Sequence, residues 1–133
     1  MTEPLDVVRA MYEAIDARDW DGGFALLTDD FEWHEPAQAF HGGKHSGFEE
    51  IRQRLEAQLE VFDEFSIEPE EFRVEGQRVA VSVRQRARGG VSGAEVEIRI
   101  GHLWTVRGDE IARLDVFAAR DEALRALEPE RPA

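Results

Sequence analysis

The sequence predicts one α+β domain in which helices come first and pack on one face of a curved antiparallel sheet. Three observations lead to this fold class. Apolar residues recur at helical spacing in the first half of the chain, they alternate with period two from residue 65 to residue 117, and short turns join the later segments. A chain of 133 residues suits a single domain over residues 1–133, and we expect its core to cover about residues 3–128.

The first helix is predicted in the opening segment, where Pro4 stands in a first turn that tolerates proline. Its apolar residues recur three or four positions apart and share one face: Leu5, Val8, Met11, Tyr12 and Ile15. A short second helix is predicted over residues 20–27, with Asp19 as a candidate N-cap.

A short strand is predicted over residues 31–35, and it ends at Pro36. A glycine-rich loop leads from this strand to the longest predicted helix, which we place at about residues 47–63. Ser46 and Glu49 have the spacing of a capping box, in which each side chain satisfies a free backbone amide at the start of a helix. Apolar residues continue the helix at helical spacing: Phe48, Ile51, Leu55, Leu59 and Phe62.

Four strands are predicted in the second half of the chain, and a last short helix follows them at residues 121–127. The strands begin near Phe65, Val79, Val96 and Ile111, and turn residues at 75–77, 88–93 and 107–109 join them. Joins this short make the strands antiparallel neighbours. Gly101 lies inside the third of these strands and predicts a bulge or a sharp bend. A bent sheet around a long helix leaves a cone with an open mouth, which is a shape that holds small ligands.

Composition excludes several classes of function. The chain carries 16 Lys and Arg against 29 Asp and Glu, a net charge of −13, and such an acidic surface repels nucleic acids and anionic membranes. No cysteine is present, so disulfides, thiol nucleophiles and cysteine metal sites are excluded. His41 and His45 are four residues apart but lie in a glycine-rich loop without an obvious third ligand, so we expect no metal and no cofactor. There is neither an apolar stretch of about 20 residues nor a signal-peptide pattern, and we expect a cytoplasmic protein.

Strand parity indicates which side chains face the hollow of the sheet. Glu35 shares a face with Trp33, and His102 shares a face with Trp104, so we expect Glu35 and His102 to point inward. The last strand is ambiguous, because both of its faces carry apolar residues and its charges, including Asp115, fall on only one of them.

If Asp115 points inward, it meets Glu35 and His102 in one apolar pocket. A carboxyl group in such a place resists ionisation, so its pKa rises toward the working pH. A carboxylate beside a neutral imidazole can remove a proton from carbon or oxygen and return it elsewhere, as isomerases, dehydratases and aldol-type cyclases do. Arg113, on the same face as Asp115, either pairs with it or stabilises a developing oxyanion.

Each of these residues also has a purely structural explanation. Glu35 can end a strand in water at the pocket rim, His102 can be a core histidine with one satisfied nitrogen, and Asp115 can form a surface ion pair. Four aromatic residues are expected to be core or pocket lining: Trp33, Phe40, Trp104 and Phe117. Tyr12 is either a core residue with its hydroxyl near the cavity, which helical spacing favours, or a surface residue.

Five stretches of the sequence resemble one known family, and together they cover nearly the whole chain: residues 7–14, 19–27, 28–33, 47–52 and 111–127. The chain resembles a SnoaL-like domain of the nuclear transport factor 2-like superfamily, which also holds ketosteroid isomerases, limonene epoxide hydrolases and scytalone dehydratases. The resemblance implies a cone-shaped, cystatin-like roll. The superfamily hosts enzymes, binding modules and dimerisation modules, so the fold alone does not assign a function.

The resemblance also implies site residues. Glu35 matches the position of the general base of ketosteroid isomerases, but their oxyanion-hole tyrosine and acid fall on Met11 and Gly101, which argues against steroid isomerisation. Asp115 matches the last-strand acid of SnoaL-like cyclases and limonene epoxide hydrolases, and His102 corresponds to a histidine of the cyclases.

One motif of the limonene epoxide hydrolases is missing. These enzymes need an Arg-x-Asp motif on the strand before the last, and here Arg99 is followed by isoleucine and glycine. The resemblance implies that Ile111, Asp115 and Phe117 face the cavity and that the outer face of the sheet pairs in a homodimer.

Together these observations predict a cofactor-free acid/base protein acting on a small apolar organic molecule. Asp115 would be the general acid/base, His102 would assist it or orient the substrate, and Glu35 would be a second acid/base near the mouth. Isomerisation, cyclisation, hydration or dehydration would each fit. The residues expected to bind the substrate are Tyr12, Trp33, Phe40, Trp104, Arg113 and Phe117. One alternative is a ligand-binding or dimerisation module without turnover, and another is a protein that binds a basic partner through its acidic surface.

Overall fold

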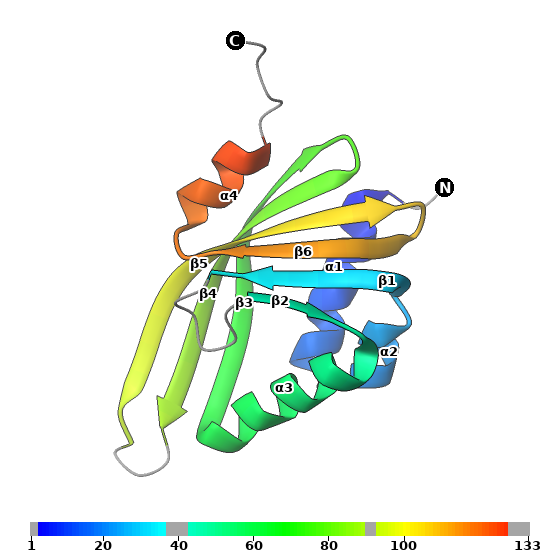
Figure 1. Ribbon diagram of the computed structural model, residues 1–133. Coiled ribbons are helices and arrows are strands. Elements are labelled where there is room, and N and C mark those ends of the chain that lie inside the picture. Colours follow the sequence, from blue (N-terminus) through cyan, green and yellow to red (C-terminus); the bar gives the residue numbers. More distant parts are fainter. Residues whose placement is uncertain (1–2, 37–42, 90–92, 128–133) are drawn as a thin grey trace.

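The computed structural model describes residues 3–36, 43–89 and 93–127, and the side chains of all of these except residues 58–63. Within these residues, helices and strands follow one another in the order that the sequence predicts, with one additional strand (Figure 1). The elements are α1 (Pro4–Asp16), α2 (Trp20–Phe24), β1 (Leu27–Glu35), β2 (Gly43–Ser46), α3 (Phe48–Val61), β3 (Phe62–Glu75), β4 (Arg78–Gly89), β5 (Glu95–Arg107), β6 (Glu110–Phe117) and α4 (Arg120–Leu127).

The six described strands form one curved sheet in the order β2-β1-β6-β5-β4-β3. The predicted α+β class is therefore confirmed, and β3 to β6 are antiparallel neighbours as their short joins predict. Two features differ from the prediction. The four-residue strand β2 replaces part of the predicted loop, and β1 pairs with β6 in the parallel direction. Both arise from pairing with strands distant in sequence, which local patterns do not report.

Helix starts agree with the sequence in one case and differ in another. Asp19 caps α2 as expected, because its Oδ1 accepts a hydrogen bond from the Gly22 amide at 3.0 Å. The capping box predicted for Ser46 and Glu49 is wrong, because α3 begins one residue later than Ser46 would require. Gly47, with φ of +89°, precedes the first helical residue, and its carbonyl accepts the first backbone bond, from Ile51. Ser46 belongs to β2 instead.

The two faces of the sheet carry different cores. The inner face packs against α1, and its largest fully buried side chains include Val79, Val81 and Ile111. The outer face packs against α4, where Ala80 and Leu103 meet Ala123 and Leu127. Val79, Val81 and Val83 alternate as the sequence predicts, and the residues between them are buried as well, because the sheet is covered on both faces here.

Arg78 fixes α4 on the outer face of the sheet. Its guanidinium donates hydrogen bonds to the carbonyls of Ala126 and Leu127, at 3.1 and 2.9 Å. These carbonyls lie at the end of the helix, where no intrahelical donor remains, and a cation there is favourable.

A glycine is required at position 101 because helix α4 packs closely against it, and no bulge occurs there. The pairing of β4 with β5 runs past Gly101 without a register shift. A Cβ atom at Gly101 would lie 2.6 Å from the Cβ of Ala123 and 3.1 Å from the Cα of Arg120. The predicted bulge is therefore absent, and the glycine allows α4 to approach the sheet closely.

An irregularity does occur at the join between β5 and β6. Trp104 pairs with Leu114 and Val106 pairs with Ile111, so β6 has one extra residue between these pairs. A bulge of this kind exchanges the faces on either side of it. Ile111 and Leu114 consequently both belong to the inner core, although their numbering predicts opposite faces.

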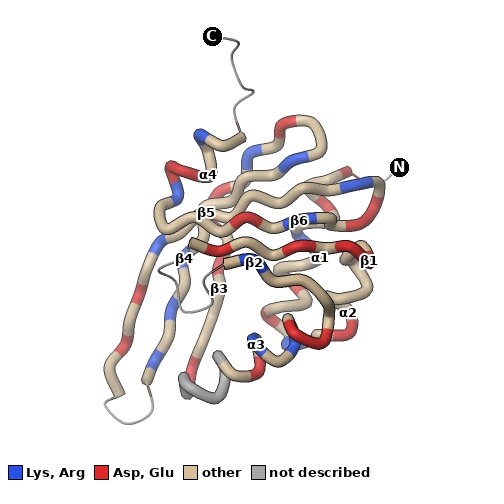
Figure 2. Tube along the Cα trace, viewed as in Figure 1, with Lys and Arg blue, Asp and Glu red and all other residues tan. Residues whose placement is uncertain are grey.

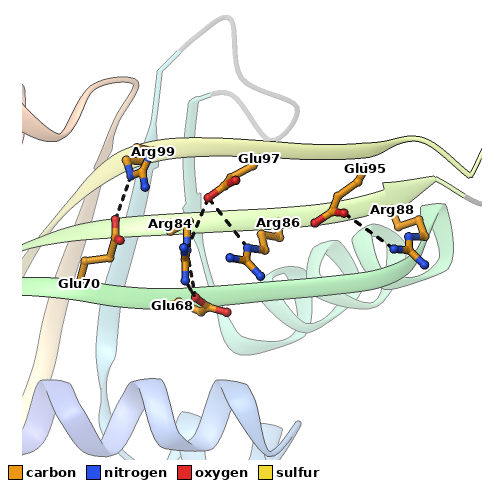
Figure 3. Close-up of polar contacts among 8 residues, drawn as sticks. All are labelled: Glu68, Glu70, Arg84, Arg86, Arg88, Glu95, Glu97 and Arg99. Carbon is orange, nitrogen blue, oxygen red and sulfur yellow. Dashed lines mark hydrogen bonds and ion pairs between the residues drawn. The ribbon is translucent and has the colours of Figure 1, made fainter.

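Charged residues cover the outer face where β3, β4 and β5 extend beyond α4. Arginines follow β4 in this region and face acids on both neighbouring strands (Figure 2). Arg99 pairs with Glu70 at 3.2 Å, Arg84 pairs with Glu68 and with Glu97, and further pairs extend this ion-pair ladder toward the strand ends (Figure 3). The ladder comprises Glu68, Glu70, Arg84, Arg86, Arg88, Glu95, Glu97 and Arg99.

The close contact at Gly101 gives a prediction for stability. Gly101→Ala should lower the free energy of unfolding by about 1–3 kcal/mol, because the added methyl group forces α4 away from the sheet. Gly23→Ala is the control, since its Cβ would meet Met11 Sδ at an ordinary 3.5 Å and alanine favours a helix. Urea denaturation of both variants checks this, and an unchanged midpoint for Gly101→Ala would contradict it.

Candidate functional site

The inner face of the sheet and the helices α1, α2 and α3 enclose a cavity of about 560 Å³. This volume lies within the range of small-molecule sites. Its wall is mostly apolar, with contributions from Met11, Phe24, Leu55, Ile67, Ile100 and Val116. The polar or charged residues of the described wall are few: Arg18, Asp19, Glu35, Gln85 and His102.

His102 is the most buried polar residue of the cavity wall, with 5% of its surface exposed. Strand β5 presents it to the inside, as strand parity predicts. The Tyr12 hydroxyl lies 2.7 Å from His102 Nδ1, and Trp104 Nε1 donates to the same hydroxyl at 2.8 Å. The Tyr12 and His102 rings are inclined by only 4°, which suits a hydrogen bond in the plane of the imidazole.

This arrangement determines the tautomer of His102. The Tyr12 hydroxyl has one proton, and it accepts the indole hydrogen of Trp104. Among the described residues it has no other acceptor than Nδ1, so it donates there. Neutral His102 then carries its proton on Nε2, which has no hydrogen-bond partner in the described part of the chain. The Nε2 atom keeps some accessible surface, and because His102 lines the cavity, Nε2 opens onto it.

Burial keeps both members of the pair uncharged. Loss of hydration lowers the pKa of His102 to about 3. The same effect raises the pKa of the Tyr12 hydroxyl far above its ordinary value, and the hydrogen bond from Trp104 opposes it only partly. At neutral pH, His102 is therefore a neutral hydrogen-bond donor toward the cavity.

Glu35 provides a titratable carboxyl group in the same wall. It ends strand β1 on the face of Trp33, as predicted, and its Oε1 accepts a hydrogen bond from the Trp33 indole at 3.2 Å. Burial raises the pKa of Glu35, while this hydrogen bond and the charge of His45 act in the opposite direction. A partly buried carboxyl group with a raised pKa is suited to carrying a proton.

His45 is a neighbour of this carboxyl group that the sequence did not single out as part of a pocket. It pairs with Trp33 across the β1–β2 ladder, its ring centroid lies 4.9 Å from that of Trp33, and it is only 3% exposed. Its Nδ1 lies 3.2 Å from Glu50 Oε1, at the start of α3. The sequence did not predict β2, because Gly42, Gly43 and Lys44 give this segment the composition of a loop and no alternation of apolar residues.

Asp115 lies outside the cavity, so the prediction that it points inward is wrong. The bulge in β6 puts Leu114 and Val116 on the inner face and turns Asp115 to the outer one. There it accepts two hydrogen bonds from Arg113, at 2.8 and 2.9 Å. Arg113 is likewise an outer-face residue rather than a substrate ligand. The surface ion pair that the sequence left open is what the structure shows.

The predicted aromatic lining is found in part. Trp33, Trp104 and Phe117 line the cavity, whereas Tyr12 is not among the lining residues and contacts His102 instead. Phe40 and His41 lie outside the described residues. In the described part of the chain, no group of three or more histidine, aspartate and glutamate side chains is arranged to hold a metal ion. No helix there is long and apolar enough to cross a membrane.

Comparison with known families supports the architecture. A family model described as a SnoaL-like domain matches residues 8–114, most of the chain. The chain belongs to the SnoaL-like domain family. This confirms the resemblance inferred from the sequence. No curated protein sequence matches this SnoaL-like domain.

Solved structures similar to this SnoaL-like domain share its fold. An NTF2-like protein from Burkholderia thailandensis E264 is 24% identical with a TM-score of 0.82, covering 97% of this chain and 100% of that chain. TerC, co-crystallised with polyporic acid, is 22% identical with a TM-score of 0.78, covering 95% and 98%. A hypothetical protein from Catenulispora acidiphila DSM 44928 has a ketosteroid isomerase-like fold and is in complex with trimethylamine. It is 15% identical with a TM-score of 0.74, covering 86% and 85%.

The buried histidine gives a prediction for the pH dependence of stability. Because the pKa of His102 is lower in the folded than in the unfolded chain, the stabilisation is complete above about pH 6.5 and is lost as the pH falls toward about 3. His102→Asn keeps an acceptor for Tyr12 but does not titrate. From pH 7 to pH 4.5, wild type should therefore lose about 2 kcal/mol more than His102→Asn.

Denaturant unfolding of both proteins at a series of pH values measures this difference. The carboxyl groups, including Glu35, are common to the two proteins and cancel in the comparison. Parallel stability profiles for wild type and His102→Asn would show that the imidazole is already charged or solvated in the folded state.

Proposed function

We propose that this SnoaL-like domain binds a small apolar organic molecule in the cavity and moves a proton on it without a cofactor. Glu35 is the acid/base, and the Nε2–H group of His102 is the hydrogen-bond donor that orients the ligand. The observation that carries the proposal is that one apolar cavity holds both a carboxyl group with a raised pKa and a neutral imidazole with an available proton.

The chemistry supported by these two groups is enolisation. The Glu35 carboxylate removes a proton from a carbon next to a carbonyl group, and the electron pair of that C–H bond moves to form the enolate. His102 donates a hydrogen bond to the oxygen where negative charge develops, which lowers the energy of the enolate. In one outcome Glu35 returns the proton to another carbon of a conjugated enolate, giving an isomer. In the other, the enolate carbon forms a bond to a second carbonyl carbon, the electron pair of that C=O π bond moves to its oxygen, and Glu35 gives its proton to the resulting alkoxide, which completes a ring.

Relatives with bound organic molecules support ligand binding in this fold. The structure of TerC contains polyporic acid, and the Catenulispora protein contains trimethylamine. The alternative is that the domain binds its ligand without turnover, which the same cavity would also allow. Turnover of a probe distinguishes the two.

Homodimerisation through the outer face of the sheet is a further part of the proposal. Since α4 covers Ala80 and Leu103, the interface would include the ion-pair ladder on β3, β4 and β5. Sedimentation equilibrium should then give twice the chain mass of 15.1 kDa, and a monomer at micromolar concentration would contradict this. A cytoplasmic location stays a prediction of the sequence.

The test of catalysis is hydrogen–deuterium exchange of the methyl protons of 2-acetylnaphthalene in D2O, followed by proton NMR. Wild type should accelerate the exchange over buffer, and Glu35→Gln should lower the protein-dependent rate by at least about 100-fold. Glu32→Gln is the matched control, because Glu32 lies on the same strand but on the other face, bonded to His34 at 2.8 Å.

Each outcome has a clear meaning. A rate lost in Glu35→Gln and kept in Glu32→Gln supports proton transfer by Glu35. Equal rates in Glu35→Gln and wild type would exclude Glu35 as the base. Binding of the probe without any acceleration by wild type would favour the ligand-binding alternative.

A further inference from the structure

We infer that the cavity selects an uncharged ligand carrying a hydrogen-bond acceptor, such as a ketone, and rejects a carboxylate of the same shape. The inference rests on the proposed function in that the ligand occupies the same cavity. It concerns the charge of the ligand, which neither the fold nor the apolar wall determines.

The hydrogen-bond chain at the inner end of the cavity holds His102 neutral. A proton on Nδ1 would face the Tyr12 hydroxyl at 2.7 Å, where the hydroxyl already accepts a hydrogen bond from Trp104. The Tyr12 proton would then need a new acceptor, and the described residues offer none. A positively charged imidazole is therefore strongly disfavoured at this position near neutral pH, and His102 presents one N–H group and no charge to a ligand.

Arg18 is the sole basic side chain in the described cavity wall, and its guanidinium is already engaged. It donates to the Ile15 carbonyl at 3.2 Å and to the Phe65 carbonyl. Both bonds are exposed, and they join the segment that follows α1 to β3. Because Arg18 is bonded to two carbonyl groups, the described part of the wall offers no free cation to pair with an anionic ligand.

The acids of the wall add to this selection. Asp19 and Glu35 both line the cavity. The negative charge of Asp19 offsets the positive charge of Arg18 even when Glu35 is protonated, so the described wall has no net positive charge. An anion entering would lose its hydration in an apolar space and gain only neutral donors from the described wall, His102 and Gln85, which is strongly unfavourable. An uncharged carbonyl group loses far less hydration and gains the same hydrogen bond.

Three probes with one skeleton separate these contributions. They are 2-acetylnaphthalene, which is uncharged and has an acceptor; 2-isopropenylnaphthalene, in which CH2 replaces the oxygen; and 2-naphthoate, which is the anion. Equilibrium dialysis at pH 7.5 measures the dissociation constant of each. We expect the ketone to bind about 5-fold more tightly than the alkene, as one hydrogen bond predicts, and at least about 10-fold more tightly than the carboxylate.

Two variants identify the donor. In His102→Asn the preference for the ketone over the alkene should fall to about 1-fold. The asparagine oxygen takes the place of Nδ1 as the acceptor for Tyr12, and the side chain is too short to bring its N–H2 group to the position of Nε2. In Gln85→Leu, which removes the other uncharged polar side chain in the described wall, the preference should persist. The wild-type comparison of the three probes stands by itself if either variant fails to fold.

The inference is overturned if 2-naphthoate binds wild type as tightly as the ketone, or if ketone and alkene bind equally. Those results would leave proton transfer by Glu35 intact, since it is measured separately by exchange. If none of the three probes binds, the cavity is not a site for apolar molecules, and the proposed function fails together with the inference.

Discussion

The hydrogen-bond chain from Trp104 through Tyr12 to His102 is the interaction on which the rest of the site depends. It joins α1 to β5 across residues 90 positions apart in sequence and places three polar groups inside an apolar core. The Trp104 and Tyr12 donors each have an acceptor, so their burial leaves neither of these two groups unpaired. Because the chain ends at Nδ1, the remaining nitrogen of His102 is the one polar atom that this network turns toward the cavity.

The shape of the cavity follows from how the sheet is covered on both faces. Val79 and Val81 face α1 while Ala80, between them, faces α4, so β4 is held from two sides. Gly101 allows α4 to lie close to the sheet, and Arg78 holds the end of that helix. Beyond α4, the outer face of the sheet carries ion pairs that contact water. The inner face of the same strands remains apolar and lines the cavity.

The bulge in β6 decides which acids belong to the site. By numbering alone, Ile111 and Asp115 share a face, and the family resemblance places both in the cavity. One extra residue between them leaves Ile111 inside and turns Asp115 to the ion pair with Arg113. In the described wall, Glu35 is therefore the carboxyl group that a strand of the sheet contributes. Its environment is set by Trp33, which donates a hydrogen bond to it, and by His45, which packs against Trp33.

The sequence by itself determined the elements whose signals are local. The face formed by Val8, Met11 and Tyr12, the alternation along β4 and β5, and the turns between strands depend on neighbouring residues, so periodicity alone predicted them. Parity also placed Glu35 and His102 inside. Tertiary structure decided what depends on distant contacts: the pairing of β2, the parallel join of β1 to β6, the close approach of α4 to Gly101 and the orientation of Asp115. A bulge or a cross-sheet hydrogen bond is selected by packing across the whole fold, and no short stretch of sequence contains that information.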